Sequence, residues 1–359
     1  MSFNPQEPYN SIPLLPPDFN FDQVEILKLL NKANNALTKL SVLASKLPNA
    51  ELLVHPLLIG ESVASSGIEN INTTVREAFE AEILPQEKRV GPAKEVLHYK
   101  DALLFGLEQV KRRGFISTND IIEMQKMIEP GHQGIRRLDA VIQNSTTKEV
   151  IFTPPTGESA LRDLLKNLEE YMNVHEDDVD HILKSVIVHY QFECIHPFTD
   201  GNGRVGRILM LLYLIMKGKL EYPVLFLSKY IFTHRNDYYV NLRATTTTND
   251  FTELLLYFLE AIEKESLVTI EVVESIIQLI EKTKKITEEH FASFRPGLLD
   301  CIFSRALLTI DYVQDYLKLQ ARQTAAGYLS KLTELGVLKS KKIGRQKVFY
   351  NEDFILLLS

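Results

Sequence analysis

Apolar residues recur at every third or fourth position along most of this 359-residue chain, and such spacing predicts α-helices. Residues 22–47 show the spacing most clearly, with apolar side chains at Val24, Leu27, Leu30, Ala33, Leu37, Leu40 and Leu43. The same reasoning predicts helices at about 56–68, 92–112, 117–129 and 178–193, and one that begins near Ser159. Because helical periodicity dominates the chain, we expect a mainly α protein.

One stretch, residues 138–154, departs from the helical pattern. Its β-branched and aromatic residues, Val141, Ile142, Val150, Ile151 and Phe152, flank the turn-prone sequence Asn144-Ser145-Thr146. Strand-forming residues on both sides of a turn predict a short β-hairpin, here ended by Pro154 and Pro155.

The helix predicted at 203–217 is apolar on nearly all sides after Arg207. A helix without a polar face is typically buried, so this one is expected at the centre of a helical bundle. Its apolar run, 208–216, is much shorter than the roughly 20 residues that cross a bilayer, and no membrane span is expected.

The last hundred residues predict a different unit. A long amphipathic helix from about Ile262 to His290 precedes two helices at 309–317 and 321–335 and two strands at 337–340 and 348–350. This order resembles a winged helix-turn-helix domain. We therefore divide the chain into an N-terminal helical region (1–110), a core (111–261), and a linker helix with the winged helix (262–359).

Composition is that of an ordinary soluble protein, with 45% hydrophobic and 24% charged residues. A net charge of −7 argues against a protein that coats nucleic acid. The two cysteines, Cys194 and Cys301, are too few for a disulfide framework or a zinc cluster. Residues 1–20 lack the basic and apolar segments of a signal peptide, so a cytoplasmic protein is expected.

Positive charge is nevertheless concentrated near the end of the chain. Between residues 318 and 350 only Glu334 is acidic, whereas the basic residues are Lys318, Arg322, Lys331, Lys339, Lys341, Lys342, Arg345 and Lys347. A local basic face is typical of nucleic-acid binding. Winged helices also bind proteins, so DNA and protein both stay open as partners of this region.

Residues 196–207 read His-Pro-Phe-Thr-Asp-Gly-Asn-Gly-Arg-Val-Gly-Arg. The glycines let the backbone approach phosphate oxygens, and a helix that begins near Asn202 would offer its N–H groups to an anion. Arg204 and Arg207 are three apart, so they share a helix face and can bind one polyphosphate. Asp200 is a carboxylate suited to a phosphate-bound Mg²⁺, and His196 can accept a proton at neutral pH.

The same glycines also spell the dinucleotide fingerprint, with Gly201, Gly203 and Gly206 followed by Glu221. That fingerprint requires a strand that runs directly into the first glycine. Here Pro197 and a polar loop stand before the first glycine, so we reject a dinucleotide-binding fold.

The twelve residues resemble the signature of the Fic (Fic/Doc) family at every defining position. The resemblance implies a Fic-type helical bundle that uses ATP and Mg²⁺ to transfer AMP to Ser, Thr or Tyr hydroxyls of target proteins. It implies the following roles: His196 as base, Asp200 as metal ligand, Phe198 under the loop, Gly201, Asn202 and Gly203 in the anion hole, and Arg204 and Arg207 on the β- and γ-phosphates. The phosphorylating branch usually has lysine at position 203, so Gly203 favours AMP transfer.

In this family a β-hairpin called the flap holds the target side chain in line for attack. The resemblance assigns this role to Val150, Ile151, Phe152 and Thr153. Backbone pairing gives affinity without reading sequence, which suits loosely specified targets. An edge hairpin with only a structural role is the alternative. Tyr238 and Tyr239 are candidates for the wall of the adenine pocket, and core packing is the alternative for both.

The sequence Ser65-Ser66-Gly67-Ile68-Glu69-Asn70 resembles the inhibitory motif of the family. Ser65 and Glu69 are four apart and share a helix face. A carboxylate placed against Arg207 would occupy the guanidinium that the γ-phosphate needs. In some relatives the same glutamate assists the removal of AMP, so Glu69 is expected to affect both directions. Taken alone, six such residues would indicate only an exposed helix end.

The resemblance thus predicts a protein adenylyltransferase that is autoinhibited by Glu69 and, as family members often are, a homodimer. The alternative is a DNA-binding regulator whose Fic-type core senses ATP but has lost its activity.

Overall fold

The computed structural model describes residues 3–47, 49–132, 134–143, 147–290 and 295–359. The fold is mainly helical with two small antiparallel hairpins, as predicted. The elements of the N-terminal region and core are α1 (Val24–Ala44), α2 (Ala50–Ile68), α3 (Val75–Glu82), η1 (Gln86–Lys88), α4 (Gly91–Arg113), α5 (Thr118–Ile128), β1 (Ile142–Gln143), β2 (Val150–Phe152), α6 (Glu158–Asn173), α7 (His181–Ile195), α8 (Asn202–Met216), α9 (Leu227–Thr233) and α10 (Arg235–Thr248). The remaining elements are α11 (Thr252–His290), α12 (Leu298–Phe303), α13 (Ile310–Tyr316), α14 (Arg322–Glu334), β3 (Lys339–Ile343), β4 (Gln346–Tyr350) and α15 (Glu352–Leu357).

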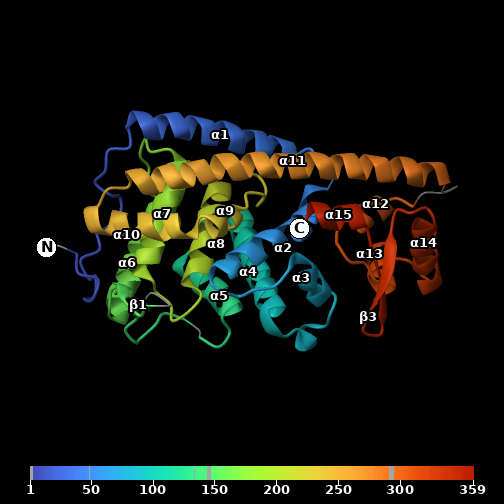
Figure 1. Ribbon diagram of the computed structural model, residues 1–359, viewed down its shortest axis with the longest axis horizontal. Helices are drawn as coiled ribbons and strands as arrows, with labels where there is room; N and C mark the ends of the chain where they lie inside the picture. Colours follow the sequence, from blue (N-terminus) through green and yellow to red (C-terminus); the bar gives the residue numbers. More distant parts are fainter. Residues whose placement is uncertain (1–2, 48, 133, 144–146, 291–294) are drawn as a thin grey trace.

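Helices α7 and α8 pack against each other at the centre of the bundle (Figure 1). Nearly every residue of α8 is buried, which confirms the prediction from its all-round apolar sequence. Helix α4 approaches α8 closely because Gly106 has no side chain. A Cβ atom there would lie 2.4 Å from Cδ1 of Leu212 and 2.8 Å from Sδ of Met124. The central helix is therefore enclosed by α4 and α7.

Helix α11 runs along one side of the molecule beside α1 and continues to the C-terminal elements (Figure 1). The prediction that it begins near Ile262 was wrong, because it begins at Thr252. Asp250 accepts a hydrogen bond of 2.9 Å from the Thr252 N–H, and buried Leu255 and Phe258 extend its apolar side. The helix thus runs through position 261, the boundary that the sequence predicts between the core and the linker helix.

The predicted hairpin is confirmed, with Ile142 of β1 opposite Phe152 of β2. The predicted turn Asn144-Ser145-Thr146 lies outside the described residues. A segment from the N-terminus lies beside β2, where the Tyr9 N–H donates to the Thr153 carbonyl at 3.0 Å. The Thr153 hydroxyl donates to the Pro5 carbonyl at 2.7 Å. The hairpin is therefore fastened on this side by residues far away in sequence.

The C-terminal unit (residues 297–359) contains the predicted pair of helices, α13 and α14, followed by the hairpin β3–β4. Strand β3 extends to Ile343, further than the sequence suggested. Lys341 forms an ion pair with Glu80 of α3, and Asn49 donates to Asp300 at 2.9 Å. These contacts hold the unit against the N-terminal helices. Among the described residues, no helix combines the length and apolarity that a membrane crossing requires.

Candidate functional site

The loop between α7 and α8 holds the sequence motif in one defined shape. His196 ends α7 in the left-handed conformation, with φ of 46°, and Gly201 precedes α8 with φ of 83°. The Asn202 side chain bonds both backbone groups of Phe198, accepting from its N–H at 2.9 Å and donating to its carbonyl at 2.8 Å. Phe198 is fully buried beneath the loop. The Asn202 amide thus shapes the loop, which presents the N-terminal turn of α8.

His196 is partly buried, and charges of both signs lie near its ring: Arg136 on one hand, and Glu69 and Asp200 on the other. Burial, and then the charge of Arg136, lower the pKa of His196 to about 4. The Nδ1 atom of His196 is buried and forms no hydrogen bond within the described residues. The imidazole is therefore neutral near pH 7 and can accept a proton.

Arg136 connects this loop to the hairpin, a role that the sequence did not reveal. Its Nε donates to the His196 carbonyl at 2.9 Å, and another of its nitrogens donates to the Pro155 carbonyl just after β2. The side chain is buried, and burial lowers its pKa. An arginine in a polar stretch normally indicates exposure, so only the fold identifies it as a link between loop and flap.

Arg207 is buried, and α2 supplies its partners. Its Nε donates to the Ser65 hydroxyl at 2.9 Å, and its terminal nitrogen donates to the Ser65 carbonyl at 2.9 Å. The same nitrogen lies 3.0 Å from Oε1 of Glu69, which is the contact predicted from the sequence. Three charge-assisted bonds therefore occupy one guanidinium.

Gly203 makes this arrangement possible. A Cβ atom at position 203 would lie 2.5 Å from Oε1 of Glu69 and 3.1 Å from a terminal nitrogen of Arg207. The Glu69 carboxylate thus rests against the first turn of α8, where free N–H groups and the helix dipole attract anions. An internal carboxylate fills a position suited to phosphate.

Helix α2 is held in place by a second acidic side chain. Glu61 is buried and accepts hydrogen bonds from the Ser228 hydroxyl and, at 3.2 Å, from the Ser228 N–H; Ser228 belongs to α9. The Tyr99 hydroxyl of α4 donates to it at 3.3 Å. Burial raises the pKa of Glu61 to about 7, and the Ser228 bonds oppose that rise. Asn70 continues the anchoring, because its side-chain oxygen accepts from Arg235 at 3.0 Å.

Within the chain the two arginines of the motif pair with different carboxylates, and their joint binding of one polyphosphate stays a prediction. Arg204 is buried and forms an ion pair with Glu129 at the end of α5, whereas Arg207 pairs with Glu69. Two nitrogens of Arg204, Nε and one terminal nitrogen, lack hydrogen-bond partners in the described chain. Sequence reasoning missed Glu129 because the pairing depends on how α5 packs against α8.

Asp200 lies at the mouth of the site with 59% of its side chain exposed. Its Oδ1 accepts a hydrogen bond of 2.6 Å from the Gly201 N–H. No cluster of three or more candidate metal ligands occurs in the described part of the chain. A single exposed carboxylate fits Mg²⁺ that is bound mainly through nucleotide phosphates, not a dedicated protein cage.

A cavity of about 610 Å³ lies beside the loop, between the hairpin and α10. Its walls include Phe152 from the hairpin, Glu193 from α7, and Arg235 and Tyr239 from α10. The two tyrosines that were candidates for the adenine pocket have different positions. Tyr239 lines the cavity, whereas Tyr238 is buried and its hydroxyl lies 2.9 Å from Nε2 of His189. Of the flap residues, Ile151 and Phe152 face the cavity, and Thr153 is bound to the N-terminal segment.

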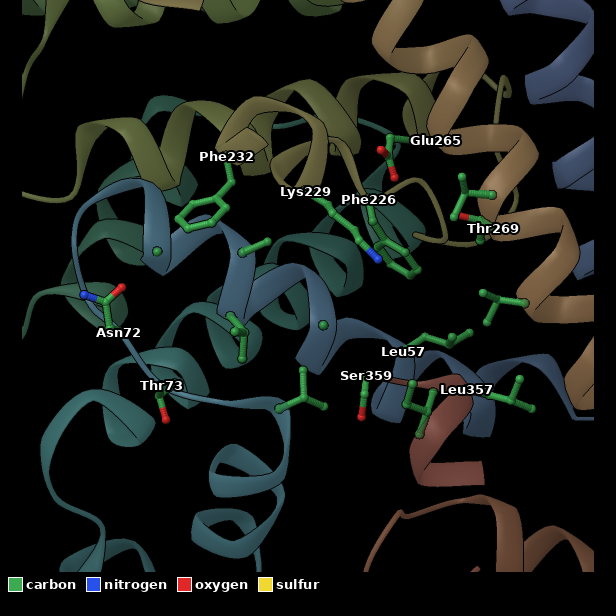
Figure 2. A pocket seen from close by; sticks show the side chains of 18 of the residues that line it. Leu57, Asn72, Thr73, Phe226, Lys229, Phe232, Glu265, Thr269, Leu357 and Ser359 are labelled. Carbon is green, nitrogen blue, oxygen red and sulfur yellow. The ribbon is translucent and has the colours of Figure 1, made fainter. Parts of the chain in front are cut away.

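A second cavity of about 340 Å³ lies behind α2, on the side away from Arg207. Figure 2 shows Phe232 and Lys229 of α9 and Glu265 of α11 around it. Gly67 allows the Phe232 ring to approach α2, since a Cβ there would lie 3.0 Å from the ring. The helix that carries Glu69 is therefore packed less fully on its outer face than on the face toward the site.

Together, the fold and site define a helical protein with a glycine-rich loop that leads into a buried helix, a histidine in that loop, and an internal carboxylate on the arginine of the helix. Three models of one family match the chain in succession. They are the Fic/DOC family N-terminal model at residues 27–108, the Fic/DOC family model at 115–214, and the C-terminal domain model of SoFic-like protein adenylyltransferases at 279–354. The chain belongs to the Fic/DOC family.

Known relatives agree with this assignment. The chain is 26% identical over 215 residues to a protein adenylyltransferase Fic of Culex quinquefasciatus, covering 58% of this chain and 41% of that protein. It is 30% identical over 178 residues to a probable protein adenylyltransferase of Aquifex aeolicus, covering 48% and 52%. The chain therefore spans about half the length, or less, of these relatives.

The fold has a solved counterpart. A Fic family protein from Desulfovibrio desulfuricans superposes with a TM-score of 0.58 over 94% of this chain and 98% of that chain, at 18% identity. The counterpart covers the C-terminal elements as well as the core, so the overall arrangement of helices is shared.

Proposed function

We propose that this chain is a protein adenylyltransferase that is held in a resting state by its own α2 helix. One observation carries the proposal. The Glu69 carboxylate lies on Arg207 at the N-terminal turn of α8, where a phosphate would be attracted. An acidic side chain that fills a phosphate site is expected in an enzyme whose nucleotide must compete with it. The names of the relatives support the same activity.

The reaction follows from the residues around the loop. A hydroxyl of the target protein attacks the α-phosphorus of ATP, and the bond from that phosphorus to the bridging oxygen breaks, releasing pyrophosphate. His196, neutral at pH 7, takes the hydroxyl proton. Backbone N–H groups of α8 and the Arg207 guanidinium bind the phosphates. Mg²⁺ held by Asp200 with those phosphates would neutralise charge on the leaving pyrophosphate.

Labelled ATP tests this reaction directly. The chain carrying Glu69→Gly, incubated with Mg²⁺ and ATP labelled at the α-phosphate, should incorporate label into protein hydroxyls, its own included. ATP labelled at the γ-phosphate should give none, because the β- and γ-phosphates leave together. Transfer of the γ-label would instead identify a kinase.

The histidine makes a separate prediction about pH. Since burial and Arg136 lower the pKa of His196 to about 4, the ring should stay neutral from pH 8 down to about pH 5. An ordinary histidine, with a pKa of about 6.5, would be mostly charged at pH 5. The His196 imidazole signals, followed by NMR against pH and assigned with a His196→Asn variant, should therefore not shift in this range. A midpoint near pH 6.5 would contradict the argument.

The hairpin is the proposed holder of the target side chain. Ile151 and Phe152 line a cavity that Glu193 and Cys194, just before His196, also line, and Arg136 bonds both the segment after the hairpin and the His196 loop. Movement of the hairpin relative to the base is thereby restricted, which favours in-line attack.

The C-terminal unit resembles a winged helix in its order of elements, and we infer that it serves partner contact. Its basic cluster is partly neutralised within the molecule. The ion pairs are Arg322–Asp311, Lys331–Glu334, Lys339–Glu352 and Lys341–Glu80. Fewer cations are thus free for DNA phosphates than the sequence count suggests, so we keep the enzyme as the proposal and not the ATP-sensing DNA regulator. A homodimer remains a prediction from the family resemblance.

A further inference from the structure

Glu193 stands three residues before His196 on α7 and has no assigned role. Its Oε1 atom is buried and accepts no hydrogen bond from any described residue. Burial raises the pKa of this carboxyl to about 7, although nearby Arg207 opposes the rise. A buried acceptor without a donor is costly, and such groups are often retained where a ligand supplies the missing bond.

Glu193 lies between the proposed phosphate clamp and the 610 Å³ cavity. On one side it lies against α8, where a Cβ atom at Gly206 would be 2.4 Å from its Oε1. Gly206 directly precedes Arg207, so the carboxyl lies near the proposed phosphate clamp. On the other side Glu193 lines the 610 Å³ cavity together with Arg235 and Tyr239 of α10.

This position constrains which part of a nucleotide can reach Glu193. With the phosphates at Arg207 and the N-terminal turn of α8, a nucleoside must extend through the cavity toward α10. The sugar then lies between the phosphates and the base, beside Glu193. Ribose hydroxyls are hydrogen-bond donors, and a carboxylate is the usual protein acceptor for them.

We propose that Glu193 accepts a hydrogen bond from a ribose hydroxyl of the bound nucleotide and so positions the α-phosphate for attack. The assignment rests on the proposed function, because it requires a ribonucleotide in this cavity. Glu193 is a positioning residue and takes no part in proton transfer. It also makes the site selective for ribonucleotides over their deoxy forms.

Two other roles fit parts of the same geometry and are separated by experiment. Glu193 could accept from an amino group of the base, or it could serve as a counter-ion for Arg207 once Glu69 has moved away. The first role predicts selectivity for the base. The second predicts an effect on every triphosphate alike.

The test measures the binding of nucleotides by titration calorimetry to the full chain carrying Glu69→Gly, with and without Glu193→Met. Methionine matches the length of glutamate but lacks a strong acceptor. The ligands are ATP, 2′-deoxy-ATP, 3′-deoxy-ATP and inosine triphosphate. Without Glu193→Met, one of the two deoxy analogues should bind roughly 10- to 100-fold more weakly than ATP, as expected for a lost bond to a charged group. With Glu193→Met, ATP should weaken by the same factor, and that deoxy analogue should bind as well as ATP.

Each other result overturns the assignment. If Glu193→Met weakens the binding of all four ligands equally, Glu193 has the counter-ion role. If Glu193→Met removes only the difference in affinity between ATP and inosine triphosphate, Glu193 recognises the base. Unchanged binding indicates a purely structural carboxyl. If the protein without the methionine substitution binds no ATP at all, the proposed function itself fails, whereas ATP binding without coupling overturns only the role of Glu193.

Controls guard against a folding defect. Glu170→Met, an exposed position on α6, should change none of the four affinities. Glu193→Gln keeps a neutral acceptor and should retain part of the preference for ribose. If thermal unfolding shows that Glu193→Met is not folded, the affinities of the four nucleotides are compared with Glu193→Gln instead.

Discussion

Replacing Glu69 with glycine should raise the rate of AMP transfer by about an order of magnitude or more. In the resting protein the Arg207 guanidinium donates three hydrogen bonds to Ser65 and Glu69, and of these two acceptor residues only Glu69 carries a negative charge. Loss of one charge-assisted bond of this kind is worth about a factor of ten or more in an equilibrium constant. The measurement is the initial rate of label incorporation from α-labelled ATP, with both proteins at equal concentration.

Two matched variants identify the cause of this activation. Glu69→Gln keeps a hydrogen-bonding side chain without the charge and should give an intermediate rate. Arg207→Ala should not activate, because it removes the phosphate clamp together with the anchor for Glu69. The double variant Glu69→Gly with Arg207→Ala should therefore be nearly as inactive as Arg207→Ala. An unchanged rate in Glu69→Gly would refute autoinhibition by this contact.

Removing the base should have the opposite and larger effect. In the activated Glu69→Gly background, His196→Ala should lower transfer by about 10²- to 10⁴-fold, the usual loss for a general base. ATP affinity should change little, since no phosphate contact is assigned to the imidazole. Single-turnover transfer and titration calorimetry measure the two quantities separately.

The conformation of His196 determines the best control for this variant. Its φ of 46° lies in the left-handed region, which alanine tolerates poorly and asparagine much better. His196→Asn should therefore keep the loop shape while lacking the base, and it should be as inactive as His196→Ala. If the asparagine variant transferred AMP at the parent rate, His196 would not be the base.

The sequence predicted the helices and the hairpin whose formation depends on the spacing of neighbouring apolar residues. The apolar spacing of α1 and the all-round apolar sequence of α8 indicated their burial, and the hairpin followed from β-branched residues around a turn. The start of α11 was missed because its first turns carry a continuous apolar sequence after a run of threonines that favours no one structure.

The site was predictable as far as its residues lie close together in the motif or carry a recognisable partner motif. Glu69 and Arg207, far apart in sequence, meet as predicted. The contacts of Arg136, Glu129 and Glu193 depend on how distant helices pack, and no single-residue pattern indicates them. The position of Tyr238 was equally unpredictable from the sequence. It depends on a hydrogen bond between its hydroxyl and the buried His189, which is distant in sequence.

The uninterrupted α11 helix has a mechanical consequence. Its 39 residues, at about 1.5 Å each, form a strut roughly 58 Å long that joins the bundle of the His196 loop to the C-terminal unit. A flexible tether would let the catalytic loop sample a wide volume around a docked partner, whereas a strut fixes its reach. For a protein docked on the C-terminal unit, the distance of each hydroxyl from the docking point would then determine which hydroxyl is modified.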